Sequence, residues 1–251
     1  MVDYRVPEQG ITSDLPVPRR ALAIGAHPDD AEFGAGATLA KWAAAGTEAT
    51  ILVLTDGSKG SWDPSLSPSD LVRARMNEQT QAAEALGVDS ALNLSYTDGE
   101  LEYTMELRAE VCLWIRRLRP QVVLTHDPWR RYMLHPDHRA TGWAAIDGVV
   151  AARDHLFFPE QLAGGLTHHR PGAVLLWAAD EPDHYEDVTG FVDHKVAALL
   201  SHSSQATTTM DGAGDSAEAT LAFRLEIDDR ARLAGAEAGL SRAEAFKRIT
   251  P

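Results

Sequence analysis

The chain has 251 residues, of which 44% are hydrophobic and 24% charged, an ordinary composition for a globular protein with a sizeable core. Its formal net charge of −14 argues against binding to nucleic acid or to an anionic membrane surface, because both partners are polyanions. The single cysteine, Cys112, excludes an intramolecular disulfide bond.

No stretch of the sequence predicts export or insertion into a membrane. Residues 1–20 lack the continuous apolar run that a signal peptide requires, and no apolar segment approaches the length needed to span a bilayer. We therefore expect a cytoplasmic protein that acts on a small molecule, and the sequence leaves open whether it forms a homo-oligomer.

Short apolar runs alternate with helical segments along most of the chain. The apolar runs, each bounded by turn residues, predict strands over 21–26, 49–55, 121–126 and 172–178. The helical segments lie at 36–46, 67–87, 104–120 and 137–156. Continuous apolar runs of this length are typical of strands buried on both faces. The pattern predicts an α/β protein with a Rossmann-like, doubly wound, mainly parallel sheet that has helices on both faces.

The last part of the chain differs in composition. Residues 206–219 are small, polar and rich in glycine, which is typical of a linker or loop. Residues 228–250 favour a charged helical tail. We therefore expect a main domain over 1–205, followed by a linker and a charged helical extension over 206–251.

Two similar histidine-containing clusters follow predicted strands. HPDD occupies 27–30, directly after the first strand, and HPDH occupies 135–138, in the loop that begins with His126 after the third. The carboxyl ends of parallel strands meet at one edge of the sheet, so both clusters should lie there. Each cluster alone is compatible with a polar loop whose aspartate caps the next helix. Two clusters at one edge favour a metal or catalytic site instead.

The residue types in these clusters suit zinc hydrolysis. Imidazoles and carboxylates are zinc ligands, and three protein ligands leave a position for water, whose pKa the metal lowers towards ~7. A free carboxylate nearby can accept the proton of that water, and a histidine held protonated by its own aspartate can stabilise the developing oxyanion. The sequence contains no HExxH, GxSxG or P-loop motif, and GAGATL at 34–39 is a poor dinucleotide fingerprint.

Five motifs in order resemble one known family. They are AHPDDAEFGAGATLAKWAAAG from residue 26, LTDGSKG from 54, an RxxE pair at Arg75 and Glu78, DGEL from 98, and HPDHRATG from 135, with KVAALLSHSSQ following at 195–205. Together, over about 21–205, they resemble the PIG-L / LmbE family of zinc-dependent N-deacetylases, which includes mycothiol- and bacillithiol-pathway deacetylases. The resemblance implies an LmbE-like fold.

The resemblance also implies a role for each residue of the two clusters. His27, Asp30 and His138 would bind one Zn²⁺ per chain, although another divalent metal could be used in the cell. Asp29 would be the general base. His135, held by Asp137, would act as the electrophile or general acid.

One position departs from the family pattern. Mycothiol-type relatives carry a tyrosine two residues before the first HPDH histidine, where this chain has Met133, with Tyr132 beside it. Either Tyr132 assists the carbonyl oxygen or His135 acts alone.

The expected substrate-binding residues are Arg75, Asp98, Tyr132 and Trp129. Each has a structural alternative. Arg75 could form a surface pair with Glu78, Asp98 could only make a turn, and the loop tryptophans Trp129 and Trp62 could pack locally.

These observations predict a zinc-dependent hydrolase that cleaves the N-acyl, in the first instance N-acetyl, amide bond of an amino sugar or related small-molecule conjugate. In this hypothesis metal-bound water attacks the amide, with aspartate as base and histidine as electrophile. Two alternatives remain open: a metal-dependent phosphoester hydrolase, and a non-catalytic sugar- or metal-binding module. Neither nucleic acid nor a membrane span is expected.

Overall fold

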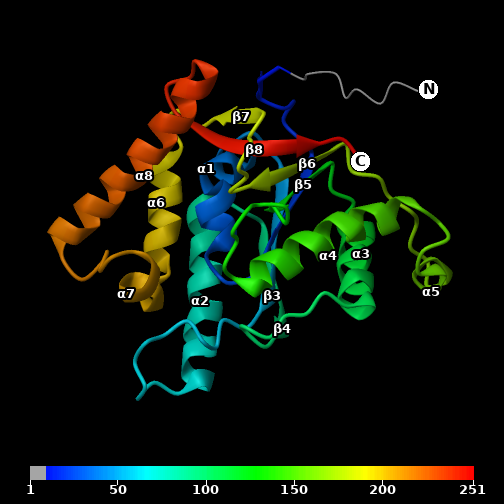
Figure 1. Cartoon of the computed structure of the whole chain (residues 1–251), viewed down its shortest axis with the longest axis horizontal. Helices are drawn as coiled ribbons and strands as arrows, with labels where there is room; N and C mark the ends of the chain where they lie inside the picture. The colour runs from blue at the N-terminus through cyan, green and yellow to red at the C-terminus, as the bar shows by residue number, and fades with distance from the viewer. Residues whose placement is uncertain (1–9) are drawn as a thin grey trace.

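The computed structural model describes residues 10–251 and confirms the predicted α/β fold (Figure 1). The strands are β1 (Thr12–Ser13), β2 (Arg20–Gly25), β3 (Glu48–Thr55), β4 (Ser90–Tyr96), β5 (Val122–His126), β6 (Ala173–Trp177), β7 (His184–Asp187) and β8 (Ala243–Ile249). The helices are α1 (Asp30–Ala44), α2 (Pro68–Leu86), α3 (Met105–Leu118), α4 (Pro136–Arg153), α5 (Pro159–Ala163), α6 (Val192–Ser201), the 3₁₀ helix η1 (Ser203–Gln205), α7 (Ala206–Thr209) and α8 (Ala217–Ala238). None of these helices is long and apolar enough to cross a membrane.

All eight strands form one sheet in the order β1-β7-β8-β6-β5-β2-β3-β4. The pairs from β6 to β4 are parallel, and β8 is antiparallel to both β6 and β7. The chain runs outward from β2 to β4 and then returns to β5 on the other side of β2. The crevice between β2 and β5 is therefore the point where the strand order reverses, which is where open α/β sheets bind ligands.

Helices cover both faces of the sheet, as the apolar strands predict. In β2, Ala21 and Ala23 face α1, α2 and α6, whereas Leu22 and Ile24 face α3 and α4. A third apolar cluster joins α6 to α8, so α8 forms an outer layer beside α6 (Figure 1). The two strands that precede the histidine clusters, β2 and β5, are thereby buried on both faces, which fixes the positions of their carboxyl ends.

The end of the chain differs from the predicted helical tail. Helix α8 ends at Ala238, where Gly239 adopts φ 71°, and residues 243–249 form strand β8. Between β6 and β7 this segment finds hydrogen-bonding partners on both sides, and Phe246 becomes fully buried. A short segment that contains alanine and glutamate has only a weak preference for helix. Hydrogen bonding to a strand on each side and burial of an aromatic side chain outweigh this preference. Residues 243–249 therefore belong to the central sheet.

Strand β8 also supports the helix that carries the first histidine cluster. Helix α1 is interrupted at Ala35, which has φ −150° and ψ 17°. The Glu244 carboxylate accepts hydrogen bonds from the Ala37 and Thr38 amides that this break leaves free (3.1 and 2.8 Å). Lys195 Nζ donates to the freed Phe33 carbonyl and to Glu244, each at 2.7 Å. The ion pair between Lys195 and Glu244 thus provides hydrogen-bonding partners for the backbone groups on both sides of the break.

We expect Glu244→Ala to destabilise the fold by about 3–5 kcal/mol, because it leaves buried Lys195 and two backbone amides without partners. Urea unfolding followed by circular dichroism measures this loss. Asp229→Ala is the matched control, since it removes an exposed ion pair with Arg232 on α8 and should change stability by less than about 1 kcal/mol. Equal effects of the two substitutions would contradict the role assigned to Glu244.

Candidate active site

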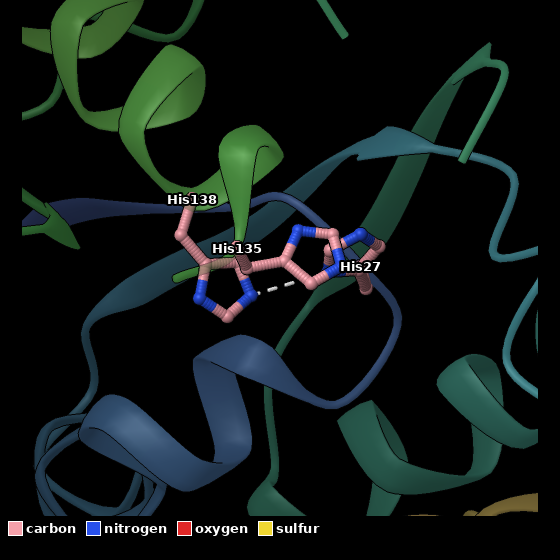
Figure 2. A group of neighbouring side chains, drawn as sticks. All are labelled: His27, His135 and His138. Carbon is pink, nitrogen blue, oxygen red and sulfur yellow. Dashed lines mark hydrogen bonds between the residues drawn. The ribbon is translucent and has the colours of Figure 1, made fainter. Parts of the chain in front are cut away.

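The structure brings the two histidine clusters together at the crevice between β2 and β5. The HPDD segment follows β2 and starts α1, and the HPDH segment starts α4 in the loop after β5. Because β2 and β5 are parallel neighbours, their carboxyl ends open at the same edge. Figure 2 shows the imidazoles of His27, His135 and His138 converging there.

Three donor groups are spaced as ligands of one metal ion. His138 Nε2 lies 3.3 Å from His27 Nδ1 and 3.2 Å from Asp30 Oδ1, and His27 Nδ1 lies 3.4 Å from Asp30 Oδ2. In a tetrahedral zinc site with bonds of about 2.0–2.1 Å, ligand atoms are about 3.3 Å apart, since the edge is about 1.63 times the bond length. The contacts of Asp30 use both of its carboxylate oxygens, and His138 belongs to two sets of closely spaced donors, His27–His135–His138 and Asp30–His126–His138. The chemistry of these imidazole and carboxylate donors fits zinc.

Two carboxylates fix the orientation of His27. Asp98 Oδ1 and Asp137 Oδ2 each lie 3.1 Å from His27 Nε2. This arrangement holds a proton on Nε2 and turns Nδ1 towards His138 and Asp30. Burial opposes a positive charge on the ring, but hydrogen bonds to Asp137, Asp30 and Asp98 outweigh it and raise the pKa of His27 to about 12. The cluster therefore stabilises positive charge at this point.

His126, to which the sequence assigned no role, is part of the cluster. The indole of Trp177 donates from Nε1 to His126 Nδ1 (3.0 Å), and His126 Nε2 lies 3.1 Å from Asp30 Oδ2. A tryptophan can only donate, so the proton of a neutral His126 must be on Nε2. Burial lowers the pKa of His126, which favours that neutral form. His126 therefore orients Asp30. Its position at the carboxyl end of β5 was the signal available in the sequence.

Asp29 is buried and strained, and it has an unsatisfied oxygen. Its φ of 106° is unfavourable for a residue with a side chain, and such strain concentrates at functional sites. Oδ2 has no hydrogen-bond partner and lies 3.5 Å from Arg75 Nη2. Burial raises the pKa of the Asp29 carboxyl to about 6, although the Arg75 guanidinium opposes the shift.

The contacts of His135 differ from the expected pairing with Asp137. The Asp137 carboxylate accepts hydrogen bonds from the amides of Gly99 (2.7 Å) and Leu101 (3.2 Å) as well as contacting His27. His135 instead caps α4, with Nδ1 accepting the Asp137 backbone N–H at 3.3 Å. Burial, together with the neighbouring His27 and His138, lowers the pKa of His135. His135 is therefore not held protonated by Asp137, and its neutral ring carries its proton on Nε2.

Arg75 and Glu78 do not form the surface pair that the sequence left open. Arg75 is only 3% exposed, and it donates to the carbonyls of Gly57 (3.1 Å) and Pro28 (2.5 Å). Glu78 is also buried and accepts hydrogen bonds from Ser203 and Ser204. Arg75 therefore braces the loops that follow β2 and β3 and lies against Asp29.

The expected substrate-binding residues divide into two groups. Arg75 and Asp98 line a cavity of about 820 Å³ that contains the histidine cluster, together with Met133 and the exposed Trp62. Tyr132 is 88% exposed and does not line this cavity. Trp129 is not a lining residue either, and its ring packs edge-on against Trp143 at 4.9 Å.

Comparison with known proteins identifies relatives of this chain. The family model described as "PIG-L: GlcNAc-PI de-N-acetylase" matches residues 22–149. A diacetylchitobiose deacetylase of Thermococcus kodakarensis is 37% identical over 187 residues, which cover 74% of this chain and 70% of the relative. A 1D-myo-inositol 2-acetamido-2-deoxy-alpha-D-glucopyranoside deacetylase of Mycolicibacterium gilvum is 30% identical over 268 residues, covering 88% and 92%.

A solved structure extends the likeness to the whole fold. The N,N'-diacetylchitobiose deacetylase of Pyrococcus horikoshii, in complex with its inhibitor MPG, superimposes with a TM-score of 0.83 at 30% identity. The match covers 93% of this chain and 84% of that protein. The chain therefore belongs to the PIG-L family, and the relatives described above are named as deacetylases.

Proposed function

We propose that this protein is a zinc-dependent amidohydrolase that removes the N-acyl group, acetyl in the simplest case, from an amino sugar or a related conjugate. One observation carries the proposal. Donor atoms of His27 and His138 and both carboxylate oxygens of Asp30 approach one another within 3.2–3.4 Å, close in the chain to the buried Asp29 carboxylate, whose Oδ2 accepts no hydrogen bond. A binding module would have no need for such a base.

His27, Asp30 and His138 would hold the metal, with His27 oriented by Asp98 and Asp137 and Asp30 oriented by His126. When bound, zinc supplies an activated water and polarises the amide carbonyl. His27 and Asp30 are themselves buried, which strengthens these electrostatic effects.

The chain's own groups then handle the protons. Asp29 is placed to accept the proton of the attacking water, because it lines the cavity and its raised pKa makes it a stronger base than an ordinary aspartate. His135 can donate from Nε2 to the carbonyl oxygen as negative charge develops on it. Asp29 returns its proton to the departing amine. Arg75 keeps the Asp29 carboxylate in position.

The lining of the cavity and the names of the relatives support an amino-sugar substrate. Lys59, Arg75, Asp98 and the backbone of Gly99 present donors and acceptors suited to sugar hydroxyls. The Thermococcus and Mycolicibacterium relatives are named for deacetylation of acetamido sugars.

The function is tested by metal analysis of the purified protein together with a screen for free amine released from N-acyl sugars. We expect about one zinc per chain and release of amine. Two metals per chain with release of phosphate from phosphoesters, and no amine, would replace this proposal with the phosphoester hydrolase.

We expect His27→Ala and His138→Ala to lower bound zinc well below one equivalent and to abolish turnover, because two protein ligands hold zinc poorly. Zinc is measured by atomic emission after gel filtration. His155→Ala, which removes an exposed histidine away from the cavity, should retain the metal. Full occupancy in either ligand variant would show that His126 or His135 takes its place in the ligand set.

The two neighbouring aspartates should respond differently to the same isosteric change. Asp30→Asn should weaken zinc binding, and added zinc should restore part of the rate, because a neutral oxygen replaces an anionic ligand. Asp29→Asn should keep its zinc but lose ~10²–10⁴ in kcat with no rescue, because the amide cannot accept a proton. Zinc titration and steady-state kinetics distinguish the two patterns. The reverse result would exchange the roles of the two residues.

Tyr132→Phe should leave kcat nearly unchanged, since this side chain projects into solvent and is not part of the cavity wall. A residue that assisted the carbonyl oxygen would instead cost on the order of 10² in kcat when its hydroxyl is removed. Steady-state kinetics on an N-acetyl sugar decide between these outcomes. A loss of that size would show that Tyr132 assists the carbonyl oxygen in place of the family tyrosine, whose position is occupied by Met133 in this chain.

A further inference from the structure

The cavity extends from the histidine cluster in two directions. One side, which we call the polar arm, lies towards β3 and β4 and is lined by Lys59, Gly60, Arg75, Asp98 and Gly99. The other, which we call the apolar arm, lies towards β6 and β8. Its lining residues are Phe33, Gly34, Ala37, Val188, Val192, Ile227, Ala231 and Ala234. The strand order places the two arms on opposite sides of the β2–β5 crevice.

Three elements build the apolar arm. Phe33 comes from the first turn of α1, Val192 from the start of α6, and Ala231 and Ala234 from one face of α8, which Figure 1 shows beside α6. The Phe33 ring packs edge-on against Phe223 of α8 (6.4 Å between centroids), which closes the arm between the two helices. The small side chains of Ala231 and Ala234 keep the wall that α8 contributes to the cavity low.

The charged groups of this arm are neutralised within the protein. Lys195 and Glu244 line it, but they are paired with each other, and their remaining hydrogen bonds go to the break in α1. Arg230 lines its solvent-exposed part and is paired with Glu226. Among the lining residues that the structure describes, the apolar arm therefore presents no unpaired charge to a ligand, and its wall suits hydrocarbon.

The structure of an amide indicates which part of the substrate each arm would bind. In an N-acyl amino sugar the sugar nitrogen and the acyl chain leave the carbonyl carbon in different directions. With the carbonyl at the histidine cluster and the sugar in the polar arm, the acyl chain enters the opposite arm. A cavity of about 820 Å³ is near the upper end of the ~300–1,000 Å³ range of ligand pockets, more than one acetamido sugar needs.

We propose that the apolar arm binds the acyl chain of the substrate, and that the enzyme therefore prefers N-acyl amino sugars with chains longer than acetyl. This inference rests on the proposed function, because it needs the scissile amide to lie at the histidine cluster. Ala234, which is half-buried and lines the arm, becomes a specificity-determining residue.

The test compares N-acetyl-, N-butanoyl- and N-hexanoylglucosamine, all of which release glucosamine, so a single assay follows every reaction. Full burial of one methylene is worth about fourfold in an equilibrium constant, so kcat/KM for N-hexanoylglucosamine should exceed that for N-acetylglucosamine by about tenfold or more. A steady fall in kcat/KM with chain length would overturn the inference while leaving the deacetylase function intact.

Two variants of α8 localise the effect. Ala234→Phe fills the apolar arm and should lower the hexanoyl-to-acetyl ratio of kcat/KM by about tenfold. Ala236→Phe makes the same change on the same helix at an exposed position outside the cavity lining, and it should keep the wild-type ratio. Equal ratios in both variants would mean that the chain binds elsewhere.

A binding measurement separates failure of the inference from failure of the proposed function. If none of the three compounds is hydrolysed, the proposed function is wrong for these sugars. Calorimetry then still tests the arm: N-hexanoylglucosamine should bind the wild-type protein more tightly than N-acetylglucosamine does, and Ala234→Phe should remove the difference. No difference in affinity in the wild type would overturn the assignment of the arm.

Discussion

The site depends on the hydrogen bonds that hold the His27 ring between Asp98 and Asp137. These two carboxylates occupy Nε2 and leave Nδ1 as the group that faces Asp30 and His138. Their own positions come from separate parts of the fold. Asp98 follows β4, and Asp137 lies in the first turn of α4, where the amides of Gly99 and Leu101 hold it. If either carboxylate moved, the ring would be free to turn its other nitrogen to the cluster.

Buried carboxylates that surround one point strongly stabilise positive charge there. Asp29, Asp30, Asp98 and Asp137 are all buried, and Arg75 is the guanidinium that faces them. Burying carboxylates without compensation is costly, so the site stabilises a proton on His27 or, in the proposed function, a divalent cation. The same field makes the neighbouring Asp29 a poor acid and a good base. The proposed metal ligand Asp30 and the proposed base Asp29 can therefore be neighbours in the sequence although their roles differ.

The end of the chain contributes more to this site than its composition suggests. Glu244 on β8 satisfies the broken helix that begins with Asp30, and α8 forms one wall of the apolar arm. Sheets of this class carry many activities because the loops and helices at the rim change while the strands do not. Here the segment after residue 205 shapes the rim and completes the sheet at once, so substrate preference and fold stability are coupled through β8 and α8.

The sequence by itself determined the layers of the fold and the residues that meet at the crevice. Continuous apolar runs reveal buried parallel strands because both faces of such strands need hydrocarbon, and the HPDD and HPDH segments follow β2 and β5 directly or within one loop. Strands β4, β7 and β8 lack that signal. Polar residues interrupt the apolar ones in each of them, and β8 becomes a strand only because β6 and β7 offer it hydrogen-bonding partners.

Only the tertiary structure decided which side chain faces which. Asp137 contacts His27 rather than His135 because its carboxylate is held by the amides of the loop after β4, which is distant in sequence. Arg75 contacts Asp29 rather than Glu78 because the carbonyls of Pro28 and Gly57, in the loops after β2 and β3, hold its guanidinium. Neither choice follows from spacing along one helix or one loop. Each is set by groups that meet only when the sheet has formed.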